Sequence, residues 1–244
     1  MINEVYDSYL NKNNSGNILY EYDKELKLLL FKYLIIVENK IKMLFTNNFI
    51  SRYGDDISLL YNTNNFDKNM FIEETIKLFD KQLNQYLDSN NVVNYYLKNY
   101  EKVPIKVYIN CISFGLIRDF IKYSKQNDKD HIYKLISNIQ PKKMDTILDL
   151  LVIARNLCCH NDILFSYENN KLEIPDLDFY KKNYKKNNFL AIVLSLKVYL
   201  NDDDYLTLIE GIYNLMIRYS KKLNISINVI CNLTNLPNNK KELI

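Results

Sequence analysis

The stretch LYEYDKELKLLLFKYLIIVENKIKMLFTNNF, residues 19–49, decides the fold class. Its apolar side chains recur every three or four residues, which is the period of an amphipathic α-helix. Neither proline nor glycine interrupts the stretch. The sequence therefore predicts one long helix, whose buried stripe consists of Leu26, Leu29, Leu30, Tyr33, Val37, Ile41, Leu44 and Phe45.

The rest of the chain also favours helices. Its 244 residues are 48% hydrophobic but include only 4 glycines and 4 prolines, whereas β and α/β folds need these residues at many turns. We expect an all-α fold, a single domain over residues 1–244, with one small β-hairpin at 165–174 around Asn169-Asn170. Further helices are expected at 67–87, 93–100, 105–123, 128–137, from Pro141 to the stretch at 154–162, and at 189–200, 204–223 and 225–233.

Charge and cysteine usage narrow the compartment and the partners. The net charge of +3 permits an RNA partner without requiring one. The first residues lack a basic and apolar leader pattern, and no apolar run of membrane-spanning length occurs. The four cysteines form no recognisable disulfide framework. A reduced cytoplasm and no membrane contact are therefore expected.

The stretch ARNLCCHND, residues 154–162, carries the candidate chemistry and one of the two histidines. On a helix, Asn156 and His160 lie one turn apart on the same face, and the long side chain of Arg155 can reach round to them. Histidine can move a proton at the ribose 2′-hydroxyl or at the leaving oxygen. Arginine can hold the phosphate, and asparagine can orient either group. These are the parts needed to cleave RNA without a metal.

Two other interpretations of the same stretch exist. A histidine is favoured at a helix end by the helix dipole, and this spacing from an arginine is common by chance. A zinc site is disfavoured because Cys158, Cys159 and His160 are consecutive, so their side chains point in different directions around the helix. No spaced cysteine pair elsewhere completes such a site. We therefore interpret the cysteines as packing residues and expect no metal and no cofactor.

Three stretches of the sequence, in order, resemble a known family. They are residues 19–30 continuing to 38–41, residues 103–116 with their Ser-Phe-Gly segment, and the Arg-Asn-x3-His motif at 155–160. Together they are similar to the Abi-like abortive-infection proteins of the AbiD/AbiF type, in the HEPN superfamily of helical ribonucleases. The resemblance covers roughly residues 19–167, with a helical tail at about 188–233 beyond it.

The resemblance implies an HEPN-like helical bundle with additional helices. It also implies an active site in which Arg155 and His160 act with Asn156, and a homodimer in which two such motifs face each other. The product would carry a 2′,3′-cyclic phosphate, and no metal would be needed. Some family members are associated with a small noncoding RNA that restrains them, as in a toxin–antitoxin system.

The sequence departs from the family pattern near the motif and offers several basic clusters for RNA. Ile163 stands where the family often has a basic residue, and Lys106 stands where it has an aromatic residue after proline. Exposed lysines in a lysine-rich protein are more commonly a solvated surface than a binding site. The candidate RNA contacts are Arg118, Lys122, Lys142, Lys143, Lys181, Lys182, Lys185 and Lys186, the last four interleaved with Tyr180 and Tyr184.

These observations lead to a metal-independent endoribonuclease of phage defence as the leading function. A non-catalytic module that binds a structured noncoding RNA and regulates a toxin is the alternative. A purely structural helical interaction protein, in which the motif is incidental, is the third possibility.

Overall fold

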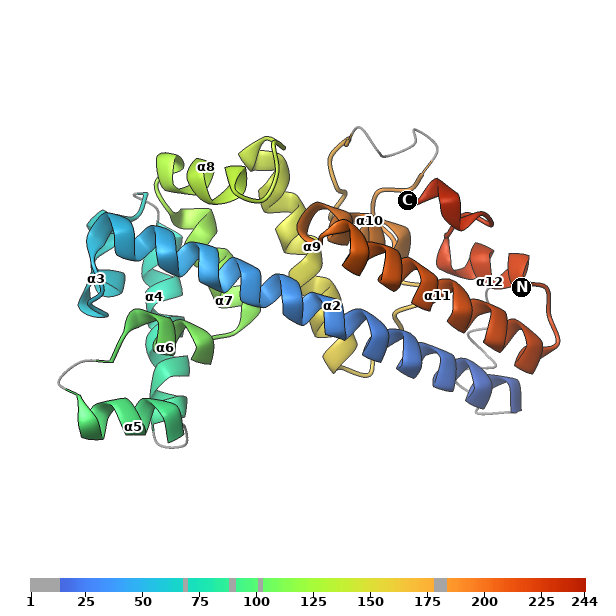
Figure 1. Ribbon diagram of the computed structural model, residues 1–244, viewed down its shortest axis with the longest axis horizontal. Coiled ribbons are helices and arrows are strands. Elements are labelled where there is room, and N and C mark those ends of the chain that lie inside the picture. Colours follow the sequence, from blue (N-terminus) through green and yellow to red (C-terminus); the bar gives the residue numbers. More distant parts are fainter. Residues whose placement is uncertain (1–13, 68–69, 88–90, 101–102, 178–183) are drawn as a thin grey trace. The chain divides into compact units, whose positions relative to one another are not determined.

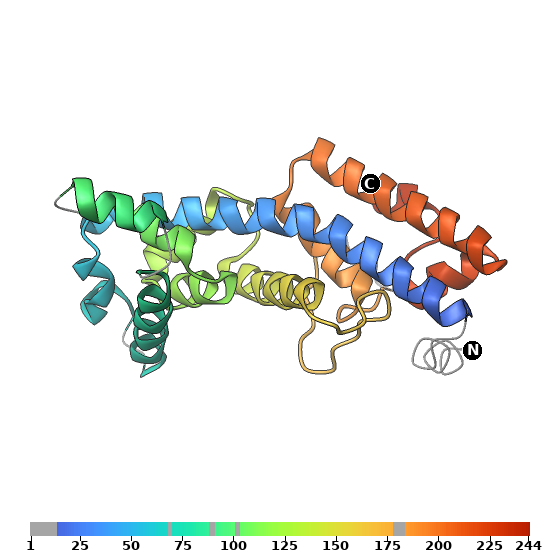
Figure 2. The same cartoon turned by 90° about the horizontal axis from the view of Figure 1, so that it is seen from below.

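The computed structural model of the chain describes residues 14–67, 70–87, 91–100, 103–177 and 184–244. These residues form helices and no β-strand, in agreement with the expected all-α class (Figure 1; Figure 2). The elements are α2 (Asn14–Tyr53), α3 (Ser58–Tyr61), η1 (Thr63–Asn65), α4 (Met70–Leu87), α5 (Asn91–Asn99), α6 (Ile105–Cys111), α7 (Phe114–Tyr123), α8 (Gln126–Lys134), α9 (Pro141–Cys159), α10 (Phe189–Tyr199), α11 (Asp202–Leu223), α12 (Ile227–Thr234) and η2 (Lys240–Glu242).

The chain divides into two compact units, one made of residues 1–37 and 146–244 and the other of residues 38–145. Both α2 and α9 contribute residues to each unit. The single domain expected over residues 1–244 stays a prediction, because compactness alone does not say whether the units fold separately. None of the helices in the described part of the chain is long and apolar enough to cross a lipid bilayer.

In the unit of residues 1–37 and 146–244, α10 forms the centre of the core. Its sequence FLAIVLSLKVY is apolar on every side, as expected for a helix that is covered all round. The long helix α11 lies along the first part of α2 (Figure 1; Figure 2). Gly211 permits this close approach, because a Cβ there would lie 2.9 Å from the Leu29 side chain. The Tyr219 ring packs 5.3 Å from the Tyr22 ring across the same contact.

In the unit of residues 38–145, aromatic rings form the core around Phe120 of α7. The centroid of its ring lies 5.8 Å from Phe45 of α2, 5.6 Å from Phe66 and 5.5 Å from Phe79 of α4. All four side chains are buried. Edge and tilted contacts of this kind add to the stabilisation from burying the apolar surface itself.

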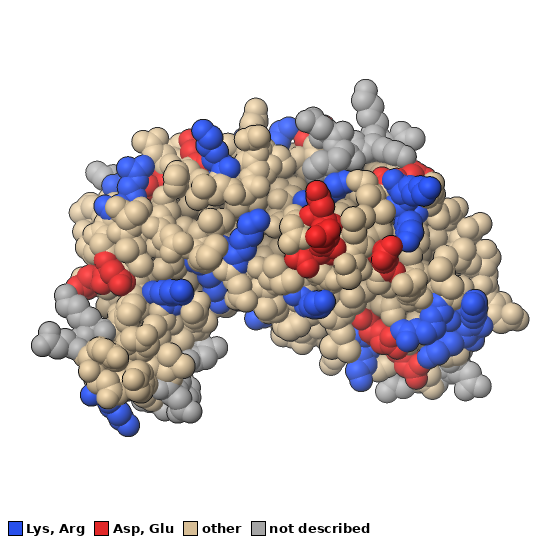
Figure 3. Space-filling model, viewed as in Figure 1, with Lys and Arg blue, Asp and Glu red and all other residues tan. Residues whose placement is uncertain are grey.

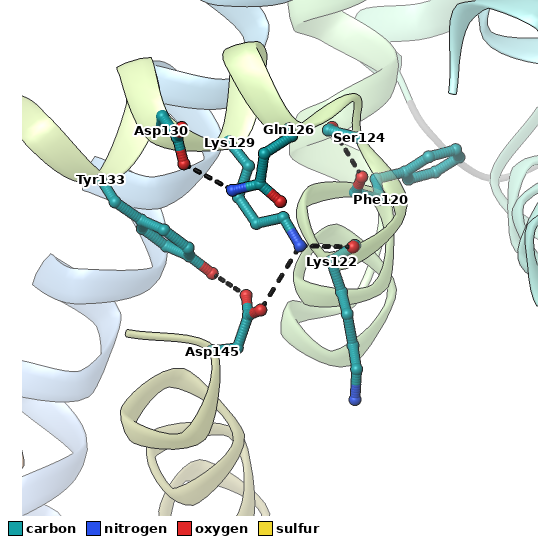
Figure 4. Close-up of polar contacts among 8 residues, drawn as sticks. All are labelled: Phe120, Lys122, Ser124, Gln126, Lys129, Asp130, Tyr133 and Asp145. Carbon is teal, nitrogen blue, oxygen red and sulfur yellow. Dashed lines mark hydrogen bonds and ion pairs between the residues drawn. The ribbon is translucent and has the colours of Figure 1, made fainter. Parts of the chain in front are cut away.

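A polar network joins α7 and α8 to the start of α9 in the same unit (Figure 4). The Lys129 ammonium donates to the Lys122 carbonyl at 3.0 Å and pairs with Asp145 at 3.4 Å. The Tyr133 hydroxyl donates to the other Asp145 carboxylate oxygen at 2.6 Å. Asp145, near the start of α9, therefore anchors the helix that carries the Arg-Asn-x3-His motif.

The segment 105–123, expected as one helix, is two helices that meet at Ile112 and Ser113. Lys42 of α2 is buried, pairs with Glu38 at 2.8 Å and donates to the Ile112 carbonyl at 2.6 Å. The Ser113 hydroxyl accepts from the Leu116 backbone N–H at 3.3 Å and so caps α7. The Lys42 ammonium pairs with the carbonyl at the end of α6, and the Ser113 hydroxyl pairs with an N–H group at the start of α7. A continuous helix would have paired such groups internally.

The β-hairpin expected at residues 165–174 is wrong, since the described chain there contains no strand. Backbone groups of residues 168–174 pair with residues 186–188, just before α10, and not with one another. Glu168 forms an isolated bridge with Asn188, the Asn169 N–H donates to the Asn187 carbonyl at 2.7 Å, and the Ile174 N–H donates to Lys186 at 2.8 Å. The alternating pattern of this segment therefore reflects pairing with a distant partner.

The last part of the chain is capped and packed. The Asn201 side chain caps α11 by accepting from the Asp204 N–H at 2.7 Å, and three aspartates occupy the first turn of this helix. After α12 the chain forms η2, and Leu243 after it is buried. The other expected helices are confirmed, with ends that shift by a few residues.

Candidate functional site

The Arg-Asn-x3-His motif occupies the end of α9, as the sequence predicted. Arg155 is half-buried on the helix, whereas Asn156 and His160 are exposed. His160 lies one residue beyond the helix, and its backbone N–H donates to the Asn156 carbonyl at 3.1 Å. The three residues therefore share the end of one helix, and the imidazole is open to solvent.

Two residues of α2 fix the backbone that follows the motif. Asp23 is 1% exposed, and its carboxylate accepts from the backbone N–H groups of Leu164 at 2.8 Å and Phe165 at 3.0 Å. Lys27 pairs with the other Asp23 oxygen at 2.8 Å and donates to the His160 carbonyl at 3.2 Å. We call Asp23 and Lys27 the brace, because together they hold both ends of the segment 160–165.

The local sequence explains why the brace forms. Asp23 and Lys27 are four residues apart on α2, so their side chains meet on one face. Leu164 and Phe165 are buried, and the Phe165 ring packs 5.9 Å from the Tyr22 ring. Their N–H groups would lose hydrogen bonds to water without gaining a partner, and the Asp23 carboxylate supplies that partner.

A pocket of about 200 Å³ lies between the brace and the motif, entirely within the unit of residues 1–37 and 146–244. Of the three motif residues, only His160 lines it. Lys24 and Lys27 outnumber the single carboxylate, Asp23, so the pocket wall carries a net positive charge without any contribution from His160. The residues that line it are Tyr20, Asp23, Lys24, Lys27 and Leu28 of α2 with Cys158, Cys159, His160 and Asn161.

Among these lining residues, the sequence motif predicted a functional role for His160 alone. Tyr20, Lys24 and Lys27 were missed, although all three lie inside the 19–30 stretch that carries the family resemblance. The sequence does show that Asp23 and Lys27 form a charged pair at helical spacing. The pair lies in the same predicted helix as the apolar stripe but is not part of that stripe. Nothing in the sequence indicated which distant segment this pair would contact.

Cys158 is half-buried and Cys159 is exposed, so the packing role expected of both motif cysteines is supported only for Cys158. Burial is the main cause that raises the pKa of the Cys158 thiol to about 12, and the adjacent Cys159 raises it further. Burial also raises the thiol pKa of Cys111 and of Cys231. Among the described residues, no group of three or more histidines, cysteines or carboxylates could hold a metal ion. The absence of a metal and a cofactor from the reaction nevertheless stays a prediction.

The candidate RNA contacts are scattered over both units. Arg118 and Lys122 of α7 and Lys142 and Lys143 of α9 belong to the unit of residues 38–145, while Lys185 and Lys186 belong to the other. Lys181 and Lys182 lie outside the described residues.

Acidic neighbours neutralise part of this set. Arg118 pairs with Asp119 at 2.8 Å, Lys185 pairs with Glu168 at 3.1 Å, and Lys186 pairs with Asp176. On the face shown in Figure 3, basic and acidic side chains lie interspersed. An RNA contact at any of these lysines and arginines therefore stays a prediction.

Among three comparisons with known proteins, only the comparison with protein families finds a match. A family model described as Abi-like protein matches residues 9–166, which is more than half of the 244 residues. The matched span contains the brace, the whole pocket wall and the motif, and it ends one residue after Phe165. Among curated proteins and among solved structures, none shows a significant match to the chain.

Proposed function

The chain belongs to the Abi-like protein family, and we propose from this premise that it is a metal-independent endoribonuclease. Membership of the family implies a role in abortive infection, which is a defence against phage. The proposal adds the chemistry: an HEPN-type ribonuclease that acts in the cytoplasm, as part of an abortive-infection or toxin–antitoxin system. Its composite site is formed by Arg155, Asn156 and His160 of two copies of the chain.

The position of His160 carries the proposal. Its side chain is exposed at the wall of an electropositive pocket, while its backbone is held by the Lys27 ammonium at 3.2 Å. A catalytic group needs a fixed backbone and an accessible reacting atom, and this arrangement provides both. An incidental histidine at a helix end has no need of a buried ion pair that anchors the segment after it.

In the proposed reaction, the ribose 2′-oxygen attacks phosphorus and the bond from phosphorus to the 5′-oxygen breaks. His160 takes the proton from the 2′-hydroxyl or gives one to the departing 5′-oxygen. Arg155 holds the phosphate oxygens as negative charge develops on them, and Asn156 orients the reacting groups. The products are a 2′,3′-cyclic phosphate and a 5′-hydroxyl.

A second copy of the chain completes this chemistry. One proton leaves the attacking oxygen and another joins the departing oxygen, and one imidazole begins the reaction in only one of these roles. A homodimer with facing motifs would supply a second His160 for the other role and a second Arg155 for the phosphate.

The donor set of the pocket supports chemistry without a metal. Magnesium prefers carboxylate and carbonyl oxygens. The pocket offers a single carboxylate, Asp23, whose two oxygens are engaged by Lys27 and by two backbone N–H groups. Binding a divalent ion there would require breaking the brace.

Cleavage of RNA in excess chelator tests the proposal. Purified chain is incubated with total RNA and with structured RNA, and the fragment ends are examined for cyclic phosphate. Replacing His160 by alanine should lower the rate at least about 100-fold, since general acid–base catalysis contributes this much or more. Arg155→Ala should also lower it. The matched control is His131→Ala, which removes the other histidine, an exposed residue of α8.

The alternative gives a different result in the same assay. Absence of cleavage together with tight RNA binding by both the parent chain and His160→Ala would exclude the ribonuclease. That outcome would favour the non-catalytic module that binds a structured noncoding RNA and regulates a toxin.

A further inference from the structure

We propose that the pocket beside His160 binds one unpaired nucleotide of the RNA. The base would stack on Tyr20, and the neighbouring phosphate would bind Lys24. The inference rests on the proposed function, because it places this nucleotide next to the phosphate on which His160 acts. It assigns the substrate a structural requirement, a single-stranded position beside the cleaved bond.

The first observation is a stripe of three side chains on α2. Tyr20, Lys24 and Leu28 follow each other at intervals of four residues, so they lie on one face of the helix and all line the pocket. Tyr20 is 55% exposed and Leu28 is 64% exposed. Tyr20 and Leu28 therefore present apolar surface to the pocket on either side of Lys24.

The second observation is the charge at the centre of the stripe. Within the pocket, the charges of Asp23 and Lys27 offset each other because the two groups are paired at 2.8 Å. Lys24 is exposed and makes no ion pair with any residue that the structure describes. Its ammonium therefore gives the pocket a net positive charge available to a phosphate, which is where a lysine serves as a point charge.

The third observation concerns the fit of a base. An aromatic ring flanked by a cation is the usual platform for an unpaired base, and stacking of this kind tolerates any of the four bases. A base within a duplex already has both faces stacked on its neighbours, so it cannot use the Tyr20 ring. The volume of about 200 Å³ is below the roughly 300–1,000 Å³ of ordinary small-molecule sites, so it suits part of a longer RNA.

The test measures binding in a chain that cannot cleave. In the His160→Ala background, the probes are short fluorescein-labelled oligouridylate and oligoadenylate, each alone and annealed as their duplex, in chelator. Binding is followed by fluorescence anisotropy over a range of salt concentrations. The variants are Tyr20→Ala, Tyr20→Phe and Lys24→Gln. The matched control is Lys221→Gln, an exposed lysine of α11 outside the pocket.

The proposal makes separate predictions for the ring and the charge. Tyr20→Ala should weaken binding of both single strands at least about fivefold, whereas Tyr20→Phe should keep it. Lys24→Gln should reduce the slope of log affinity against log salt by about 0.7, the value for one phosphate contact to a single strand. Lys221→Gln should bind like the background chain, and duplex binding should be insensitive to Tyr20→Ala.

Three results would overturn the inference. They are no single-strand binding by the background chain, unchanged single-strand binding by Tyr20→Ala, and loss of a dimer by Tyr20→Ala in sedimentation analysis. The last would show that a second copy of the chain covers the stripe.

Failure of the pocket proposal can be told apart from failure of the ribonuclease proposal, because the binding assay involves no cleavage. Weakened single-strand binding by Tyr20→Ala, with no cleavage by the parent chain, would sustain the pocket and exclude the ribonuclease. Cleavage by the parent chain, with KM unaltered by Tyr20→Ala, would sustain the ribonuclease and exclude the pocket. Urea unfolding of each variant confirms that a change in binding does not come from a change in stability.

Discussion

Replacing Asp23 by alanine should destabilise the chain strongly and disable the motif. Asp23 is 1% exposed, and its carboxylate accepts from two buried backbone N–H groups, of Leu164 and Phe165, while it pairs with Lys27. Alanine leaves both N–H groups without an acceptor, at a cost of about 1–3 kcal/mol each. It also leaves the Lys27 ammonium, whose side chain is 12% exposed, without its counter-charge.

Breaking a buried ion pair by removing one partner typically costs about 3–5 kcal/mol, and the same range is expected for Asp23→Ala. This is a large share of the roughly 5–15 kcal/mol that stabilises an ordinary domain. Asp23→Asn keeps one oxygen for the N–H groups and should cost less. Lys27→Met keeps the alkyl stem and leaves Asp23 its two N–H donors, so it should also cost less than Asp23→Ala.

The assay is urea unfolding followed by circular dichroism, with RNA cleavage measured on the folded variants. The matched control is Asp162→Ala, an exposed aspartate in the same segment, which should change stability by less than about 0.5 kcal/mol. A folded Asp23→Asn variant should cleave more slowly than Asp162→Ala, because the backbone after His160 is no longer held in place. An Asp23→Ala variant as stable as Asp162→Ala would refute the reasoning.

Other predictions concern the contact of α11 with α2 and the motif cysteines. Tyr219→Phe removes the hydroxyl that donates to Glu25 at 2.6 Å and should cost about 1 kcal/mol in urea unfolding. That hydrogen bond is the main cause of the lowered pKa of Glu25, with Arg218 adding to it, so Glu25 stabilises the fold above its ordinary pKa of 4.5. Glu25→Gln should therefore be less stable than the parent chain at neutral pH, and titration should show the difference vanish as the pH falls through the lowered pKa. Iodoacetamide at mildly alkaline pH should label exposed Cys159 much faster than Cys158, whose raised pKa leaves little thiolate, and equal rates in peptide mass spectrometry would contradict this.

The elements that could be predicted from the sequence are those whose pattern is local. The stripe from Leu26 to Phe45 identified α2, and Pro141 marked the first residue of α9. The division at Ser113 was missed, because the apolar residues continue through it and the Lys42 ammonium that terminates α6 comes from far away in the chain. The alternation after Phe165 looked like a hairpin, since a strand-like pattern does not reveal where its backbone partner lies.

The candidate site shows the same limit. Arg155, Asn156 and His160 could be found because their spacing on one helix is a local property. The brace could not be found, because it joins residue 23 to residues 164 and 165 with no shared period. A charged pair four residues apart on a helix is common and most often faces solvent. Only the fold shows that this pair is largely buried and bonded to backbone.

The same device occurs twice on α2. In Asp23 with Lys27 and in Glu38 with Lys42, the acid precedes the lysine by one turn. In each pair, the lysine ammonium donates a hydrogen bond to the carbonyl of the residue just past a helix, His160 after α9 and Ile112 after α6. The peptide unit has a direction: its N–H suits an anion and its carbonyl suits a cation.

Exchanging Asp23 and Lys27 would preserve their mutual attraction but would present an anion to the His160 carbonyl and a cation to the N–H groups of Leu164 and Phe165. The order of the two charges along α2 is therefore set by the polarity of the backbone groups that they contact. An exchange that looks neutral when only the ion pair is considered would leave that segment of backbone repelled at both ends.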